Sequence, residues 1–232
     1  MEDGKRRADE LDSRFTVRDP PMLKLYNRER SGNCYKVRLM LSLLGLEYEK
    51  IPVHREGKGR NILPPEFERL SPLRQIPVLV ADGKPYWGTI AILVYLARRY
   101  GGERWLPHDP EGEATVTQWL SLAQNEIFSG LGRARSMRAG RWHGYGTLEE
   151  AHAVAAIALR VLEARLSASD WLALGRPTIA DVACYSYTVF APEGGISLKP
   201  YPAVRAWLGR VQGLPNYLAT PVYDGAGGPL VE

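Results

Sequence analysis

The sequence predicts two units in one chain, a small α/β domain followed by an all-α domain. Alternating, strand-like patterns occur only in the first hundred residues, whereas later segments repeat apolar residues at helical spacing. A Gly- and Pro-rich segment, 101–110, separates the two patterns. We therefore expect an α/β domain over 21–102 and a helical domain over 111–222, after a disordered tail over 1–20.

The α/β domain begins with a strand–helix–strand pattern. Residues 22–26 alternate between apolar and polar side chains and predict a strand, and residues 48–53 predict a second one. Between them, apolar residues recur at helical spacing from Val37 to Leu44, and Gly45 ends the helix. Such a unit has two parallel strands and a right-handed crossover.

The same domain continues with a hairpin and a second long helix. A short helix is expected over 65–70, and a strand that begins with proline over 76–80. An Asp-Gly turn then predicts an antiparallel return over 84–87. The apolar segment 89–100 predicts a helix that ends at a glycine pair.

The second domain shows only helical periodicity. Four helices are expected, over 113–137, 148–166, 178–190 and 201–212. The third begins with a capping box, in which Thr178 caps the helix and Asp181 caps in return. We expect these two side chains to serve folding and not chemistry.

Composition and charge narrow the class of protein. The chain is 45% hydrophobic and 24% charged, which is typical of a globular protein. Its apolar runs are shorter than the roughly 20 residues that a membrane helix needs, so we expect no membrane partner. Residues 1–100 hold 19 Lys and Arg against 13 Asp and Glu, without a long basic block. This surplus favours a small anionic ligand over nucleic acid.

The two cysteines, Cys34 and Cys184, lie far apart and follow no disulfide or metal-binding spacing. The charged N-terminal segment lacks the apolar core of a secretory signal. We therefore expect free thiols, a cytoplasmic protein and no metal site.

Three stretches together carry a resemblance to a known family: SGNCYKVRLMLSLLGLEYE at 31–49, SPLRQIPVLVADGKPYWGTIAILVYLARRY at 71–100 and RPTIADVACYSYT at 176–188. Their order and spacing resemble the cytosolic glutathione S-transferase family over nearly all of 22–220. The resemblance implies a thioredoxin-like N-terminal domain, an all-helical C-terminal domain, glutathione as co-substrate and a homodimer.

The resemblance places thiol activation at the start of the first helix. Ser-type classes have their activating residue at the position of Ser31, and a bacterial class with a Thr-Pro-Asn-Gly motif has it at Asn33. Backbone N–H groups at a helix start favour an anion, here the glutathione thiolate. Ser31 also suits simple helix capping. Both catalytic candidates remain open at this point.

Cys34 occupies the second position of what would be a Cys-x-x-Cys redox motif, whose first position is Ser31. Two-thiol disulfide exchange is therefore disfavoured. We expect Cys34 to be a small buried residue, with a monothiol role as the alternative. Tyr26, at the end of the first strand, is expected to be a packing residue.

The expected glutathione cradle consists of Ile76, Pro77, Gly88 and Thr89. Ile76-Pro77 resembles the family's cis-proline step, whose preceding backbone pairs with the cysteinyl part of glutathione. Thr89 and its helix N-terminus are suited to the γ-glutamyl carboxylate. Many family members have an acidic or amide residue where Gly88 stands, so the contact to the γ-glutamyl ammonium lacks its side chain.

The resemblance thus implies an enzyme that activates the glutathione thiol for attack on a small-molecule electrophile. The alternatives are a glutathione-dependent disulfide reductase or isomerase, and a non-catalytic binding or regulatory module of the same fold. Four arginines lie close together in the helical domain: Arg133, Arg135, Arg138 and Arg141. They indicate either an acidic substrate or a solvated loop.

Overall fold

The computed structural model describes residues 22–54, 62–65, 67–142 and 144–220. The tail predicted over 1–20 and the last two residues of the predicted helical domain lie outside these ranges. The expected domain limits at 21–102 and 111–222 stay a prediction.

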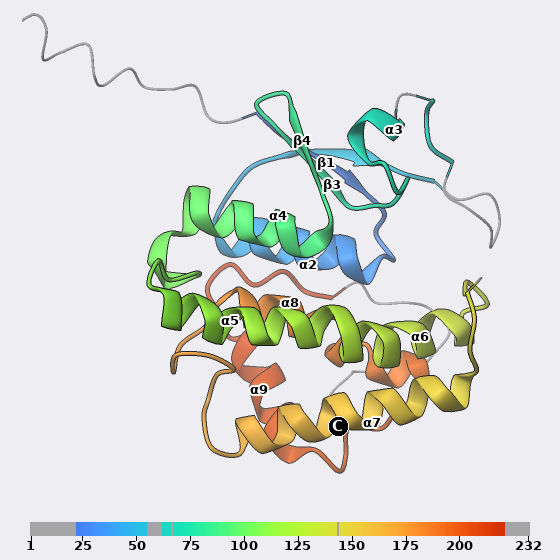
Figure 1. Ribbon diagram of the computed structural model, residues 1–232, viewed down its shortest axis with the longest axis vertical. Helices are drawn as coiled ribbons and strands as arrows, with labels where there is room; N and C mark the ends of the chain where they lie inside the picture. Colours follow the sequence, from blue (N-terminus) through green and yellow to red (C-terminus); the bar gives the residue numbers. More distant parts are fainter. Residues whose placement is uncertain (1–21, 55–61, 66, 143, 221–232) are drawn as a thin grey trace, which may run out of the picture.

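The N-terminal part is a four-stranded mixed sheet with helices on it, as the fold class predicted. Its strands are β1 (Leu23–Asn27), β2 (Glu49–Pro52), β3 (Val78–Ala81) and β4 (Lys84–Trp87). The sheet order is β2-β1-β3-β4, with β1 parallel to β2 and antiparallel to β3. The helices of this part are α2 (Gly32–Leu43), α3 (Phe67–Leu70) and α4 (Thr89–Leu96). Figure 1 shows α2 and α4 as a layer between the sheet and the C-terminal helices.

The C-terminal part is entirely helical. Its elements are α5 (Pro110–Leu122), the π-helix η4 (Ala123–Gly132), α6 (Arg133–Arg138), α7 (Leu148–Leu166), α8 (Ile179–Val189), the short η5 (Ala191–Gly194) and α9 (Pro202–Gln212). All eleven residues of α8 are buried, so it is the central helix of the fold. Both members of the predicted capping box at its start are present.

Two predictions of local structure, one of a helix and one of a linker, were wrong in detail. The single helix expected over 113–137 is three consecutive segments, α5, η4 and α6. The π-helical turns end at Gly132, and within them a Cβ on Gly130 would stand 2.5 Å from the Ala155 backbone nitrogen. Close packing against α7 thus requires glycine there. The expected linker 101–110 is partly helical, because η2 (Ala97–Gly101) and η3 (Gly102–Arg104) follow α4 directly.

The segment after α9 returns to the N-terminal part. The Tyr35 hydroxyl donates to the Leu218 carbonyl at 2.6 Å, and the Ser42 hydroxyl donates to the Asn216 carbonyl at 2.7 Å. Tyr35 and Ser42 both belong to α2, which is therefore held along its length by residues near the end of the described chain. In the described part of the chain, no helix is both long and apolar enough to cross a membrane.

Candidate active site

Strand pairing brings three separate segments to one end of the sheet. Tyr26 in β1 pairs with Val78 in β3, and Val78 pairs with Trp87 in β4. Pro77 therefore lies beside the end of β1, and Gly88 follows the strand end next to it. The residues expected to bind glutathione and the loop that leads to Ser31 consequently start from the same edge of the sheet.

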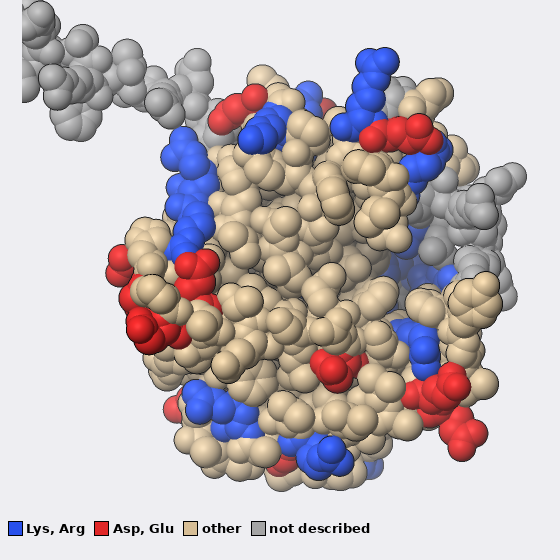
Figure 2. Space-filling view, viewed as in Figure 1, with Lys and Arg blue, Asp and Glu red and all other residues tan. Residues whose placement is uncertain are grey.

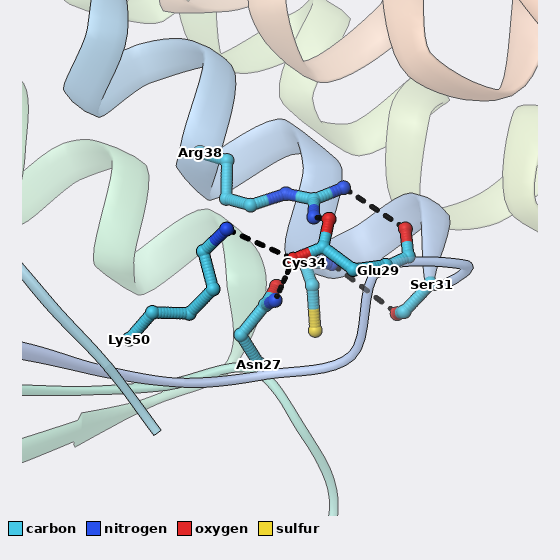
Figure 3. A network of polar contacts seen from close by, with 6 residues as sticks. All are labelled: Asn27, Glu29, Ser31, Cys34, Arg38 and Lys50. Atoms are coloured by element: carbon cyan, nitrogen blue, oxygen red, sulfur yellow. Dashed lines mark hydrogen bonds and ion pairs between the residues drawn. The ribbon is translucent and has the colours of Figure 1, made fainter. Parts of the chain in front are cut away.

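The loop between β1 and α2 is fixed by Glu29 (Figure 3). Its carboxylate forms ion pairs with Arg38 of α2 and with Lys50 of β2, the latter at 2.9 Å. Asn27 at the end of β1 donates to the same carboxylate at 3.0 Å. The Glu29 carboxylate thus links β1, β2 and α2. These contacts hold the backbone of the loop before Ser31 in place.

Ser31 is the N-cap of α2. Its Oγ accepts a hydrogen bond from the Cys34 backbone N–H at 3.2 Å, as Figure 3 shows. A hydroxyl carries one hydrogen and two lone pairs, so capping uses an acceptor position and leaves the O–H as a donor. Capping and thiol activation are thus compatible roles for this side chain.

Asn33, the other activating candidate, lies in the first turn of the same helix. Its Oδ1 is buried and makes no hydrogen bond among the described residues. Asn33 is absent from the lining of the pocket in front of the helix, which includes Ser31. Ser31 therefore lines this pocket and Asn33 does not, although both residues are partly exposed.

Cys34 is fully buried, as expected. Burial raises the pKa of its thiol, because a thiolate would lose its hydration there. A raised pKa disfavours nucleophilic chemistry by this residue. Tyr26 is also a packing residue, since its ring packs edge-on against Phe67 with the ring centroids 5.4 Å apart.

The expected cradle has the predicted backbone features. The Ile76–Pro77 peptide bond is cis. Gly88 is the N-cap of α4 with φ 82° and ψ 116°, a conformation that L residues with a side chain adopt only with strain. Thr89 is the first residue of α4 and is 5% exposed.

A small pocket opens to solvent at the start of α2. It is lined by Arg28, Arg30, Ser31, Gly32, Gly132, Arg135, Ser136, Arg141 and Tyr187. Tyr187, from α8, was not among the residues singled out from the sequence. Its ring packs so closely on α2 that a Cβ on Gly32 would stand 2.5 Å from a ring carbon. Tyr187 lies within the stretch 176–188 that carries the family resemblance, but its place at the site follows only from the packing of α8 on α2.

A buried lysine lies behind this pocket. Lys36 of α2 is fully buried, and its Nζ makes no hydrogen bond among the described residues. The ammonium stands 4.8 Å from the centre of the Tyr187 ring, a cation–π contact. Loss of hydration lowers the pKa of Lys36 to about 8. The Tyr187 ring thus contacts both the Lys36 ammonium and Gly32 at the start of α2.

Comparison with known proteins agrees with this architecture. Residues 25–104 match the family model "Glutathione S-transferase, N-terminal domain", and residues 147–215 match "Glutathione S-transferase, C-terminal domain". A crystal structure of glutathione S-transferase from Pseudomonas fluorescens is 35% identical, with a TM-score of 0.76 over 86% of this chain and 98% of that one.

Two curated relatives carry other activities in their names. The disulfide-bond oxidoreductase YfcG of Escherichia coli is 33% identical over 79% of this chain and 87% of its own. The maleylacetoacetate isomerase of Mus musculus is 28% identical over 78% of this chain and 83% of its own. Both matches extend through the sheet domain into the helices. The chain therefore belongs to the glutathione S-transferase family.

Proposed function

We propose that Ser31 activates the thiol of bound glutathione for attack on an electrophilic carbon. The observation that carries this proposal is the placement of the Ser31 hydroxyl, which lines the pocket and keeps its hydrogen available while it caps α2. A hydrogen bond from this hydroxyl, together with the N-terminus of α2, stabilises the thiolate over the thiol. The thiol then loses its proton to solvent near neutral pH.

The reaction that follows is a nucleophilic substitution or addition. The thiolate sulfur supplies an electron pair and forms a carbon–sulfur bond. In a substitution the leaving group departs with its bonding pair, and in an addition the resulting carbanion takes a proton from water. Ile76 would pair through its backbone with the cysteinyl part of glutathione, while Thr89 and the N-terminus of α4 would meet the γ-glutamyl carboxylate.

The ultraviolet absorbance of the glutathione thiolate tests the assignment of Ser31. The bound thiol should have a pKa well below that of free glutathione in the wild type. In Ser31→Ala this pKa should rise, and kcat/KM for a generic aromatic electrophile should fall about 10- to 100-fold. Asn33→Ala and Cys34→Ala are the matched controls and should change both quantities far less. A loss confined to Asn33→Ala would assign activation to that residue instead.

Calorimetry with glutathione separates the enzymatic proposals from a non-catalytic module. Saturable binding is expected, and its absence at any accessible concentration would leave only the module. The reductase and isomerase alternatives, which the names of the two curated relatives suggest, share the activated thiolate. A disulfide substrate assayed on Cys34→Ala would show whether reduction needs only the sulfurs of glutathione.

We also propose a cytoplasmic homodimer that acts in detoxification. Figure 2 supports the dimer, because the face over α4 and α5 is mostly uncharged, with Lys, Arg, Asp and Glu gathered towards its rim. A second copy that covered this face would bury few charged side chains. Light scattering after size exclusion should give about twice the chain mass of 25.9 kDa.

A further inference from the structure

We propose that Tyr187 is a further catalytic residue, for addition of the thiolate to unsaturated carbonyl compounds. Its hydroxyl donates a hydrogen bond to the carbonyl oxygen, which gains negative charge as the glutathione sulfur attacks. This inference rests on the proposed thiol activation and names the class of electrophile that the site favours. Tyr187 comes from α8 and lines the same pocket as Ser31. Two side chains with hydroxyl groups, one from each part of the fold, therefore line one pocket.

Two glycines let the Tyr187 ring approach the start of α2. A Cβ on Gly32 would stand 2.5 Å from Cε1 and 2.8 Å from Cζ, the carbon that bears the hydroxyl. A Cβ on Gly132, the last residue of η4, would stand 3.2 Å from Cε1. The Phe128 ring packs edge-on against the same ring, with the centroids 5.7 Å apart. The hydroxyl is thus held in place before the reaction, which is what a donor to a developing charge requires.

The Tyr187 hydroxyl keeps its proton and is able to donate a hydrogen bond. The Asn33 backbone N–H donates to the phenol oxygen, which uses a lone pair and leaves the hydrogen. Burial raises the pKa of Tyr187 to about 12, so the group is a phenol near neutral pH. The residue is 7% exposed, and a hydrogen bond is stronger in such surroundings than in water.

The buried ammonium of Lys36 strengthens this donor. It stands 4.8 Å from the centre of the Tyr187 ring, and its Nζ has no hydrogen-bond partner within the described ranges. A positive charge near a phenol favours negative charge on the phenol oxygen, and it therefore makes the O–H a better donor. An apolar residue would avoid the cost of burying that charge, so a role at the site accounts for the lysine.

The addition needs no reactant besides the two substrates and water. The sulfur electron pair forms a bond to the β-carbon, and the π pair of the double bond moves to give an enolate. Tyr187 keeps its proton and stabilises the enolate oxygen, and water then protonates the α-carbon. Substitution at an alkyl halide expels the halide with its bonding pair and puts no charge on a carbonyl oxygen. Tyr187 should therefore assist only the addition.

The test compares an enone, 4-phenylbut-3-en-2-one, with benzyl bromide, and each rate is divided by the uncatalysed rate. Tyr187→Phe keeps the ring and should lower kcat/KM for the enone about 30-fold or more. The value for benzyl bromide should change less than about threefold, and the pKa of the bound glutathione thiol should stay the same. Lys36→Met should lower the value for the enone by a smaller factor, about threefold.

The matched control is Tyr185→Phe, which also removes a tyrosine hydroxyl from α8. That hydroxyl lies 2.7 Å from the Tyr217 hydroxyl and accepts from the Gln212 amide at 3.2 Å, and Tyr185 does not line the pocket. This variant should lower the free energy of unfolding but leave the ratio of the two rates unchanged. Equal losses for both electrophiles in Tyr187→Phe, or no loss for the enone, would overturn the inference. A raised pKa of the bound thiol would also overturn it, since the hydroxyl would then serve the sulfur.

A binding measurement keeps the inference separate from the proposed function. The oxygen of 4-nitrophenolate stands for the enolate oxygen, and nitrobenzene lacks it. In calorimetry at a pH at which nitrophenol is ionised, Tyr187→Phe should bind 4-nitrophenolate about tenfold less tightly than the wild type, and nitrobenzene equally. If neither electrophile is conjugated, thiol activation has failed, but this selective loss would still support the Tyr187 donor. Equal binding of 4-nitrophenolate by both proteins would rule the donor out even if conjugation proceeds.

Discussion

The ring of Tyr187 lies directly against Gly32, where an added Cβ would stand 2.5 Å from Cε1 and 2.8 Å from Cζ. Two residues separated by most of the chain thus share one contact at the pocket. Burial raises the pKa of Tyr187, although a hydrogen bond from the Asn33 backbone N–H and the nearby Arg135 both act against the rise. The packing of the ring therefore determines the position of the Tyr187 hydroxyl at the start of α2.

Gly32→Ala should displace this ring and lower stability by about 1–3 kcal/mol, because the pocket side of α2 becomes overpacked. Glutathione conjugation should fall more steeply than stability does, since Ser31 is the adjacent residue. Urea unfolding and kcat/KM measure the two effects. Gly209→Ala in α9 is the control, since its added Cβ would meet nothing within 4 Å beyond the adjacent backbone of its own helix. Adding Tyr187→Leu to Gly32→Ala should restore part of the stability, and strict additivity would contradict the contact.

Because Gly88 has no side chain, we expect weak recognition of the γ-glutamyl ammonium. A glutathione analogue without that amino group should bind the wild type nearly as tightly as glutathione. Gly88→Glu should bind glutathione about tenfold more tightly than Gly88→Ala, since both bear the cost of a side chain at φ 82° but only the glutamate can meet the ammonium. Calorimetry measures both. A strong preference of the wild type for the natural tripeptide would mean that another residue makes this contact.

The burial of Lys36 should lower the free energy of unfolding by an amount that depends on pH. A pKa lowered from 10.5 to about 8 corresponds to about 3 kcal/mol of unfavourable free energy when the lysine is charged. Below pH 8 both folded and unfolded states hold the proton, and the full cost applies. Between pH 8 and 10.5 the folded state binds fewer protons than the unfolded state, so stability rises with pH.

Lys36→Met should therefore be more stable than the wild type at pH 7, and its advantage should shrink by pH 10. Urea unfolding at the two pH values is the measurement. The exposed Lys199→Met is a matched control that should show no such trend. An advantage that stays constant with pH would indicate a packing effect and not the buried charge.

Asp181 should matter for folding alone. Its carboxylate accepts from the Thr178 and Leu172 backbone N–H groups at 2.9 and 3.2 Å, and from the Trp207 indole at 3.0 Å. Asp181→Ala would strand these buried donors and should cost more than about 3 kcal/mol. The exposed capping box at Thr147 provides the comparison, because Thr147→Ala should cost only about 1 kcal/mol. Unfolding by urea measures both, and a changed thiolate pKa in folded Asp181→Ala would contradict a purely structural role.

Much of the fold could be predicted from short stretches of sequence. The limits of α7 were predicted at both ends, because a Thr-x-x-Glu box precedes it and apolar residues repeat along its whole length. Strand ends were displaced by one or two residues, as at β3, because pairing with β1 and β4 decides where a ladder begins. The π-turns of η4 could not be predicted, since they depend on how closely Gly130 approaches α7.

The candidate site was predictable where the residues lie in one motif. Ser31 and the cis Ile76–Pro77 bond follow from runs of sequence that carry the family resemblance. The sequence did not indicate that Tyr187 lines the pocket, nor that Arg135 and Arg141 are the arginines of the cluster that do so. Only the packing of α6 and α8 beside α2 brings these residues to the pocket. Arg133 instead faces Glu150, at 3.8 Å.

The hydrogen bonds from α2 to the segment after α9 also determine when this helix becomes fully anchored during protein synthesis. A ribosome makes α2 early, yet the carbonyl groups that accept from Tyr35 and Ser42 belong to Leu218 and Asn216. At about 5–20 residues per second, those partners emerge on the order of ten to thirty seconds later. A nascent chain therefore carries Ser31 on an incompletely anchored helix until the residues after α9 have been made. Truncated products should accordingly be inactive, even when their sheet has formed.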